Sequence, residues 1–233
     1  MYKWKFEGEG NERKRTIRAR LTCRGFKDKQ AGYLETYAGT AQRASQRLLC
    51  SIGAIKRWPI VACDISKAFL QGLTYQVMSE LTGEPIREVN LEITASAAEM
   101  TRQVPGFETF DERKEVLHND KPGTGLVDAP RAFSLKVQQV LTSLGMKPTT
   151  VDLEVWTWHD KPSSRTAGTD TAGCDTLVAV LTKHVDDLKI IGQAERLKKI
   201  IDALEKVFGE MTQQCNDFQN CGMRHRRDPT TNV

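Results

Sequence analysis

Two adjacent carboxylates, Asp186 and Asp187, lie between short apolar runs in the stretch LTKHVDDLKIIG, residues 181–192. Neighbouring carboxylates repel each other, and burying an uncompensated charge is costly. The pair must therefore face water in a turn or share a positive charge. Because the flanking runs are rich in Val, Ile, Leu and Thr, we expect two strands that are joined at the Asp pair.

A third carboxylate, Asp64, ends another predicted strand in the run PIVACD. An Asp–Asp dipeptide alone is a weak signal, since about one is expected by chance in a chain of this size. Three carboxylates on neighbouring strand ends, however, can hold two Mg²⁺ or Mn²⁺ ions about 4 Å apart, an arrangement that suits phosphoryl transfer. The residues therefore raise the hypothesis of a two-metal site, against the alternative of a solvated turn.

Apolar periodicity elsewhere predicts three helices and an α+β fold class. Apolar residues recur at helical spacing over residues 43–58, 128–145 and 194–209, with Asp128 near the start of the second helix. Gly145 and Gly209 are expected to end the second and third helices. Residues 73–122 show no clean period and are expected to be irregular with short strands, and residues 166–173 have the composition of a loop.

The positive charge of the chain is concentrated at its start. Residues 1–30 hold ten Lys and Arg against four Asp and Glu, whereas the rest holds 24 against 26. A strand over TIRARLT would project Arg18 and Arg20 from one face. That face is either simply solvated or a platform for phosphates, which Arg binds through forked hydrogen bonds.

Composition favours an intracellular protein without a membrane span. No apolar run approaches the ~20 residues that a span requires, and the charged opening MYKWKFEGEG is not that of a signal peptide. The six cysteines are scattered rather than densely patterned, so we expect reduced thiols.

Six segments, in order, resemble the reverse transcriptase domain of copia-type LTR retrotransposons. They are IRARLTCRGFKDKQAGYLETYAGTA (17–41), ACDISKAFLQG (62–72), VPGF (104–107), GTGLVDAPRAF (123–133), LGMKPTTVDLEVW (144–156) and HVDD (184–187). Together they extend the resemblance over residues 3–223. It implies a right-hand polymerase fold, here with fingers and palm only, in a diverged and truncated copy.

The resemblance also implies a division of the chain. Fingers would comprise residues 1–60 and 73–125. The palm would comprise residues 61–72, with the first catalytic Asp, and residues 126–212, with the Asp–Asp hairpin. Residues 213–233 would form a ragged tail.

Site roles follow by position from the same resemblance. Asp64, Asp186 and Asp187 would be the catalytic carboxylates that hold two Mg²⁺ or Mn²⁺ ions, together with the backbone carbonyl of Ile65. Phe69 would stack under the nucleotide sugar and exclude a 2′-hydroxyl, unless it is an ordinary core aromatic. The dNTP triphosphate would contact Arg18 and Arg20. The template and primer side would include Gly125, Pro130, Arg131 and His184.

Several positions depart from the family pattern. His184 replaces the Tyr before V-D-D, Val127 replaces a Lys, Phe133 replaces a Trp, and AGTA replaces A-P-V-A.

Three candidate functions are therefore considered for the chain. The first is an RNA-directed DNA polymerase fragment that extends a primer on an RNA or DNA template with dNTPs, in a cytoplasmic retroelement particle. The second is an inactive relic that at most binds nucleic acid, and the third is a two-metal nuclease.

Overall fold

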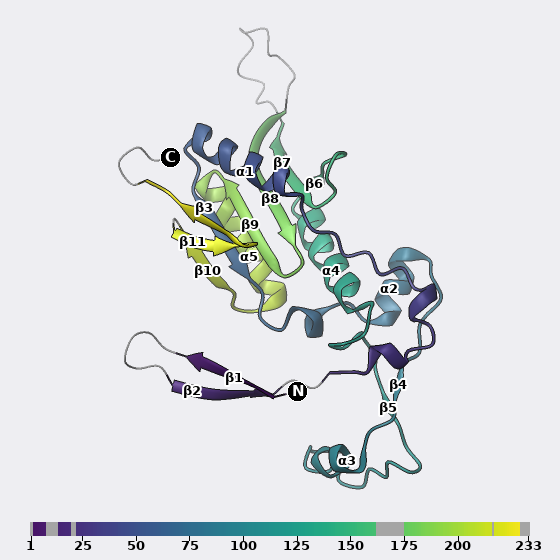
Figure 1. The fold of residues 1–233 in the computed structure, drawn as a ribbon. Coiled ribbons are helices and arrows are strands. Elements are labelled where there is room, and N and C mark those ends of the chain that lie inside the picture. Colours follow the sequence, from purple (N-terminus) through teal and green to yellow (C-terminus); the bar gives the residue numbers. More distant parts are fainter. Residues whose placement is uncertain (1, 8–13, 20–21, 162–174, 216, 229–233) are drawn as a thin grey trace. The chain divides into compact units, whose positions relative to one another are not determined.

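The computed structural model describes residues 2–7, 14–19, 22–161, 175–215 and 217–228 (Figure 1). The chain divides into two compact units, each built from two stretches of sequence. The first unit comprises residues 1–36 and 72–132, and the second comprises residues 37–71 and 133–233. The units are described separately below. The predicted loop over residues 166–173 lies outside the described residues, as does Arg20.

A six-stranded antiparallel sheet forms the centre of the second unit. Its strands are, in spatial order, β10 (Thr212–Cys215), β3 (Ile60–Asp64), β9 (Asp187–Gly192), β8 (Thr176–His184), β7 (Val155–Asp160) and β6 (Lys147–Pro148). The neighbours β8 and β9 are the two strands expected around the Asp pair, and β3 is the strand expected before Asp64. All three predictions are confirmed.

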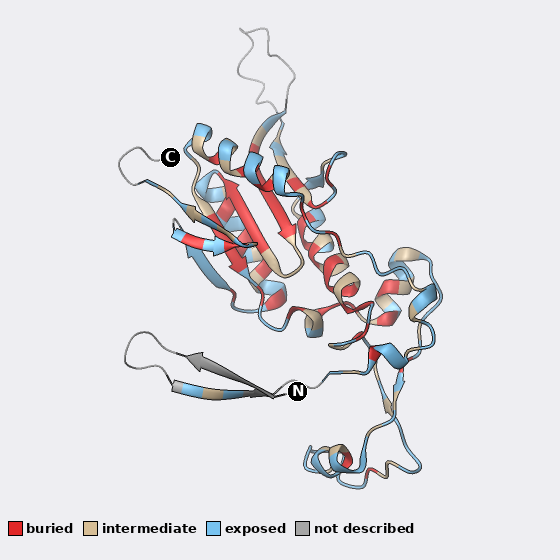
Figure 2. Cartoon of the chain, viewed as in Figure 1, coloured by how far each residue is buried: buried red, intermediate tan, exposed pale blue. Residues whose placement is uncertain are grey.

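Helices cover both faces of this sheet (Figure 1). The larger core contains side chains of α4 (Ala129–Ser143) and α5 (Ala194–Phe208), packed on alternate residues of the central strands such as Leu181 and Leu188. The intervening residues Val180 and Ile191 pack instead with Leu49 of α1 (Arg43–Lys56). Strand alternation thus gives β8 and β9 two apolar faces, and Figure 2 shows both strands as mostly buried.

The three predicted helices are confirmed with small changes at their ends. Helix α1 ends before Arg57, which adopts the left-handed conformation at φ 56°. Gly209 is the C-cap of α5, as predicted, and Gly145 follows α4 with φ +82°. A short 3₁₀ helix, η4 (Ala68–Gln71), follows β3, and the hairpin of β11 (Asp217–Asn220) and β12 (Met223–Arg226) comes after β10.

The first unit is built from short elements. A hairpin of β1 (Tyr2–Glu7) and β2 (Lys14–Ala19) precedes the 3₁₀ turns η2 (Gly25–Lys27) and η3 (Ala31–Tyr33). The segment expected to be irregular does contain short strands, because β4 (Asn90–Leu91) pairs with β5 (Leu117–His118). It also contains two helices that the sequence did not predict, α2 (Tyr75–Thr82) and α3 (Ala95–Thr101).

Two glycines allow a close backbone approach inside the first unit. A Cβ on Gly25 would lie 2.0 Å from the carbonyl oxygen of Gly125, and one on Gly125 would lie 2.3 Å from the carbonyl oxygen of Cys23. The Cys23 amide also donates to the Thr124 carbonyl at 2.7 Å. Only glycine fits at such a contact, and Gly125 in addition has φ +99°. The segments around residues 23–25 and 124–125 are thereby held together.

The structure has the mixed helix and sheet content that the α+β prediction requires. Among the described residues, no helix combines the length and apolar character needed to cross a membrane.

Candidate active site

The Asp pair lies at the tip of the β8–β9 hairpin. Strand β8 ends at His184, β9 begins at Asp187, and Val185 and Asp186 form the two-residue turn between them. Val185 has φ 58°, in the left-handed region that a β-branched residue rarely adopts. A two-residue hairpin requires a positive φ in its turn, so the tight connection holds Val185 in a strained conformation.

Asp64 meets this tip from the neighbouring strand. It is the register partner of Asp187 across the antiparallel pair of β3 and β9. Directly opposed residues project from the same face of a sheet, with Cβ atoms about 4.5–5.5 Å apart. The structure therefore brings together carboxylates that are more than a hundred positions apart in the sequence, and Asp186 adjoins them in the turn.

The three carboxylates at the tip act on one another electrostatically. Partial burial raises the pKa of Asp187, and the negative charges of Asp186 and Asp64 raise it further. His184 and Lys189 act in the opposite direction but do not outweigh these causes. The site thus concentrates negative charge, which a bound cation would relieve.

The donor chemistry suits a hard divalent cation, but the side chains are not arranged as a finished metal site. Carboxylate oxygens are the ligands that Mg²⁺ takes from proteins. Within the part of the chain that the structure describes, however, no group of three or more His, Cys, Asp and Glu side chains is placed to hold a metal ion. The carboxylates are close enough to repel, and ligation would require their side chains to turn toward a common point.

A buried ion pair lies beside the turn of the hairpin. The ammonium of Lys183 lies 2.8 Å from a carboxylate oxygen of Glu154, and their side chains are 1% and 2% exposed. Lys183 also donates to the hydroxyl of Ser134 on α4, and its carbonyl accepts from the amide of Ala41 at 2.8 Å. Burial lowers the pKa of Lys183, whereas Glu154 favours its charged form. These contacts were not predicted from the sequence.

A second buried lysine lies on β9 near the carboxylates. Lys189 is 1% exposed and donates to the side-chain carbonyl of Gln46 on α1 at 3.0 Å. Burial lowers the pKa of Lys189. The nearby Cys50, Cys221 and Asp187 act in the opposite direction but do not outweigh burial. On β8, His184 is the register partner of Asp187, and its Nδ1 atom is buried without a hydrogen-bond partner among the described residues.

The other predicted palm residues lie after β3. The side chain of Ile65 is 1% exposed and belongs to the larger core. Phe69, in η4, is partly buried and packs against the same core. This packing is what the ordinary core-aromatic alternative requires, and contact of Phe69 with a nucleotide sugar stays a prediction.

The remaining predicted residues belong to the first unit. Arg18 lies in β2 opposite Lys3, and Arg20 falls outside the described residues. Gly125 makes the close approach described above, and Pro130 lies in the first turn of α4. Arg131 follows Pro130 and donates to both carboxylate oxygens of Glu84, at 2.8 and 3.0 Å, and to the carbonyl of Glu35 at 3.1 Å.

Comparisons with known proteins give one family. The family model described as reverse transcriptase (RNA-dependent DNA polymerase) matches residues 1–214. The Retrovirus-related Pol polyprotein from transposon RE2 of Arabidopsis thaliana is 25% identical over 206 residues, which are 88% of this chain and 12% of that protein. The corresponding polyprotein from transposon RE1 of the same plant is 24% identical over 177 residues, 75% of this chain and 10% of that protein.

The chain therefore spans about an eighth or less of the length of these curated relatives. No solved structure matches the chain significantly.

Proposed function

The chain belongs to the reverse transcriptase (RNA-dependent DNA polymerase) family, as a diverged and partial copia-type domain, and from this premise we propose that it extends a primer with dNTPs. The template would be RNA or DNA, and the setting would be the cytoplasmic particle of a retroelement. The second unit would act as the palm and the first as part of the fingers of a right-hand polymerase. This proposal differs from the division given above, because residues 37–60 belong to the second unit and residues 126–132 to the first. The interleaving of the two units along the sequence supports this assignment.

One observation carries the proposal. Asp64 at the end of β3 directly opposes Asp187, and Asp186 adjoins them in a strained two-residue turn. A merely solvated turn would need neither the third carboxylate nor the opposition of like charges, which destabilises a sheet by about 0.2–1 kcal/mol. The arrangement is explained if the carboxylates serve chemistry that outweighs this cost.

Asp64, Asp186 and Asp187, with the backbone carbonyl of Ile65, would hold two Mg²⁺ or Mn²⁺ ions. Such ions would supply activation of the attacking 3′-hydroxyl and stabilisation of the leaving pyrophosphate. The contribution of the protein would be to position primer and nucleotide and to present the carboxylates together at the tip of the hairpin. The buried Lys183–Glu154 ion pair beside the hairpin turn suits that task.

Three further residues would contact the nucleotide. Arg18 and Arg20 would contact the triphosphate, and Phe69 would stack under the sugar. Replacing both arginines by Ala should weaken dNTP binding more than template binding. Equal losses would indicate a generic phosphate-binding face instead.

The residues proposed to contact template and primer are Gly125, Pro130 and Arg131 in the first unit and His184 in the second. Arg131 is engaged with Glu84 by a bidentate ion pair, so a role on nucleic acid would require exchange of that partner.

A primer-extension assay tests the function directly. Wild type, the Asp186→Asn variant and the His184→Tyr variant are compared on one primed template with dNTPs and Mg²⁺ or Mn²⁺. Loss of Asp186 should abolish extension, since it forfeits several kcal/mol of transition-state stabilisation and each ~1.4 kcal/mol is a factor of ten. If wild type and the Asn variant extend equally, the activity is not that of this site.

A second candidate is an inactive relic that at most binds nucleic acid. Two observations favour it. Within the described residues no group of three side chains is placed to hold a metal ion, and the buried Nδ1 atom of His184 has no hydrogen-bond partner. Failure of all variants to extend a primer with either metal would establish it. Metal-dependent cleavage of the template without dNTPs would point instead to a nuclease.

A further inference from the structure

Helix α1 is apolar on two sides, and only one of them is covered. Leu49 and Gly53 face the sheet, where a Cβ on Gly53 would lie 3.3 Å from the side chain of Ile191. Leu48 and Ile55 belong to the same apolar repeat along the helix but are exposed. The repeat that predicts the helix thus supplies more apolar surface than the sheet can bury.

The exposed apolar side continues onto the loop before β7. The Asp152 carboxylate accepts from the Gln42 amide at 2.9 Å and from the Ser45 hydroxyl at 2.6 Å, and these bonds hold the loop against the start of α1. Val151 and Leu153 flank this aspartate, and with the two helix residues above they are 56–86% exposed. A single exposed aliphatic side chain is ordinary, but four large ones beside one helix mark a surface that a partner can cover.

The charge beside these side chains has one sign. Residues 40–60 hold four Lys and Arg and no Asp or Glu. The four cations are all exposed, and they are Arg43, Arg47, Lys56 and Arg57. We call these cations, together with Leu48, Ile55, Val151 and Leu153, the α1 face. Because α1 of a second copy would repel it, this face suits an acidic surface.

An acidic surface lies on the segment from β4 to β5, residues 90–118 of the first unit, which we call the arm. The arm holds six Asp and Glu against three Lys and Arg, a net charge of −3. Glu92, directly after β4, and Glu99 on α3 are both exposed. The arm therefore has the charge that the α1 face lacks.

The arm also exposes apolar side chains. Met100, Val104, Phe107 and Val116 are 42–59% exposed. Val104 and Phe107 come from the segment VPGF, to which the proposed function gives no role. Protein interfaces commonly combine an apolar centre with a polar rim, and both the arm and the α1 face have that composition.

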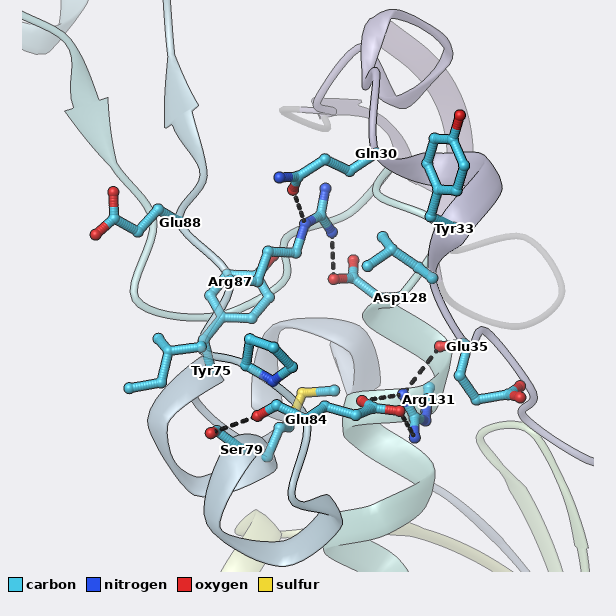
Figure 3. A pocket seen from close by; sticks show the side chains of 14 residues that line it. Gln30, Tyr33, Glu35, Tyr75, Ser79, Glu84, Arg87, Glu88, Asp128 and Arg131 are labelled. Atoms are coloured by element: carbon cyan, nitrogen blue, oxygen red, sulfur yellow. Dashed lines mark hydrogen bonds and ion pairs between the residues drawn. The ribbon is translucent and has the colours of Figure 1, made fainter.

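The base of the arm is anchored to the rest of the first unit. Arg87, three residues before β4, donates to Asp28 and to Asp128, and Figure 3 shows the second of these contacts. The amide of Asn119, directly after β5, donates to the carbonyl of Val89, directly before β4, at 2.9 Å. The arm is therefore attached at a defined place and presents its surface without unfolding.

We propose that two copies of the chain associate, with the arm of each copy on the α1 face of the other. The apolar side chains of the two surfaces pack together, and the carboxylates of the arm lie toward the cations of α1. A two-fold axis makes the two contacts equal and closes the assembly at a dimer. The inference needs neither metal nor nucleotide, so it stands or falls separately from primer extension.

Sedimentation velocity on the whole chain, without nucleic acid, measures the association. Over about 1–200 µM protein, the mass should rise from 26.2 kDa toward twice that value. Raising NaCl from about 0.05 M to about 0.5 M should weaken the dimer by about fivefold or more, because salt screens the exposed charges.

Charge reversal locates the two surfaces. The face variant carries Arg47→Glu and Lys56→Glu, and the arm variant carries Glu92→Lys and Glu99→Lys. Each variant places like charges opposite one another and should dimerise about tenfold more weakly than wild type, or worse. All four positions are exposed, so thermal melts should show both variants folded.

Combining the reversals tests whether the surfaces are partners. A chain with all four substitutions has an acidic face and a basic arm, so its dimer should return to within about threefold of wild type. Mixing the face variant with the arm variant should give the same recovery. The matched control reverses Lys198 and Lys199 on α5 to Glu, outside both surfaces, and should change dimerisation by no more than about twofold.

The apolar part is tested separately. Ile55→Ser on the α1 face and Phe107→Ser on the arm should each weaken the dimer by about tenfold, without the salt dependence of the charge variants. Full dimerisation in both would remove the apolar contact from the interface.

Other outcomes would overturn the inference as a whole. Wild type that stays a monomer over the whole concentration range would remove the interface. Loss in only one of the two reversal variants, or no recovery when they are combined, would mean that the two surfaces are not partners. If monomeric wild type binds a single strand of about 20 nucleotides and the face variant does not, the cations serve nucleic acid instead.

Discussion

Replacing Glu154 by Gln should strongly destabilise the second unit. The substitution keeps the shape of the side chain but removes its charge, and it leaves the ammonium of Lys183 buried at 1% side-chain exposure. The ammonium would then have only neutral partners, the hydroxyl of Ser134 and the amide oxygen of the new side chain. Breaking a buried ion pair from one side costs about 3–5 kcal/mol, because the surviving charge is neither paired nor hydrated.

The size of this effect can be judged against the whole protein. Domains are stable by about 5–15 kcal/mol, so the single substitution removes a large share of the total. The double variant Glu154→Leu with Lys183→Met removes both charges and retains apolar volume. It should lie within about 2 kcal/mol of wild type, since the exchange of a buried pair for hydrophobic residues is often neutral or stabilising.

Urea unfolding, followed by circular dichroism and by tryptophan fluorescence, to which the buried Trp156 contributes, measures both free energies. The matched control is Asp160→Asn, which breaks the partly exposed ion pair with Arg196 and should cost about 0–1 kcal/mol. The reasoning is refuted if Glu154→Gln costs no more than this control. It is equally refuted if the double variant is as unstable as the single one.

Three further substitutions test other parts of the structure. Asp187→Asn should stabilise the protein at pH 7 by about 0.2–1 kcal/mol, because it removes a like charge opposite Asp64. The folded-state pKa of Asp187 is raised above its usual 3.8, so wild type regains this stability on acidification and the gain should vanish in thermal melts below that pH. Gly25→Ala should cost about 1–3 kcal/mol, since its Cβ would meet a backbone oxygen at 2.0 Å, whereas Gly32→Ala, with open space around it, should be nearly neutral in the same melts. Thr74→Ala removes the N-cap of α2 and should cost about 1 kcal/mol by urea unfolding, with Thr74→Ser as the control that retains the cap.

Long periodic segments could be predicted from the sequence, and short ones could not. Helices α1, α4 and α5 each run for 14 or 15 residues, long enough for an apolar stripe to repeat several times. Helices α2 and α3 have eight and seven residues and bury few side chains, such as Tyr75 and Ala98. A helix of two turns is stable through tertiary contacts and caps rather than through its own pattern, so no periodic signal announces it.

Polar contacts, too, could be predicted only where the sequence pattern marks the positions of both partners. The meeting of Asp64 with the Asp pair could be predicted because each carboxylate marks the end of a recognisable strand. The partners of Arg87 gave no such signal, because Asp128 and Asp28 are 41 and 59 residues away and the pairing depends on packing within the first unit. The ion pair between Lys183 and Glu154 could not be predicted for the same reason. Lys183 lies in a run whose pattern indicates only a buried strand, and Glu154 lies just before another strand.

The departures from the family pattern differ in their structural consequences. Phe133, in place of Trp, is fully buried and its ring lies 5.5 Å from that of Phe208, so the core has closed around the smaller aromatic. Val127, in place of Lys, is exposed. His184, in place of Tyr, opposes Asp187 and leaves Nδ1 buried without a partner among the described residues.

Restoring the family residue should therefore have opposite effects at two positions. Phe133→Trp overpacks a closed core and should cost about 1–3 kcal/mol of stability without a gain in primer extension. His184→Tyr removes an unpaired buried nitrogen beside the carboxylates and should raise extension without loss of stability. Thermal melts and primer extension on both variants separate the two effects. Phe133→Trp could instead raise primer extension as much as His184→Tyr does. That result would show that the departures from the family pattern lower activity through the fold as a whole, and not through the hairpin that presents the carboxylates.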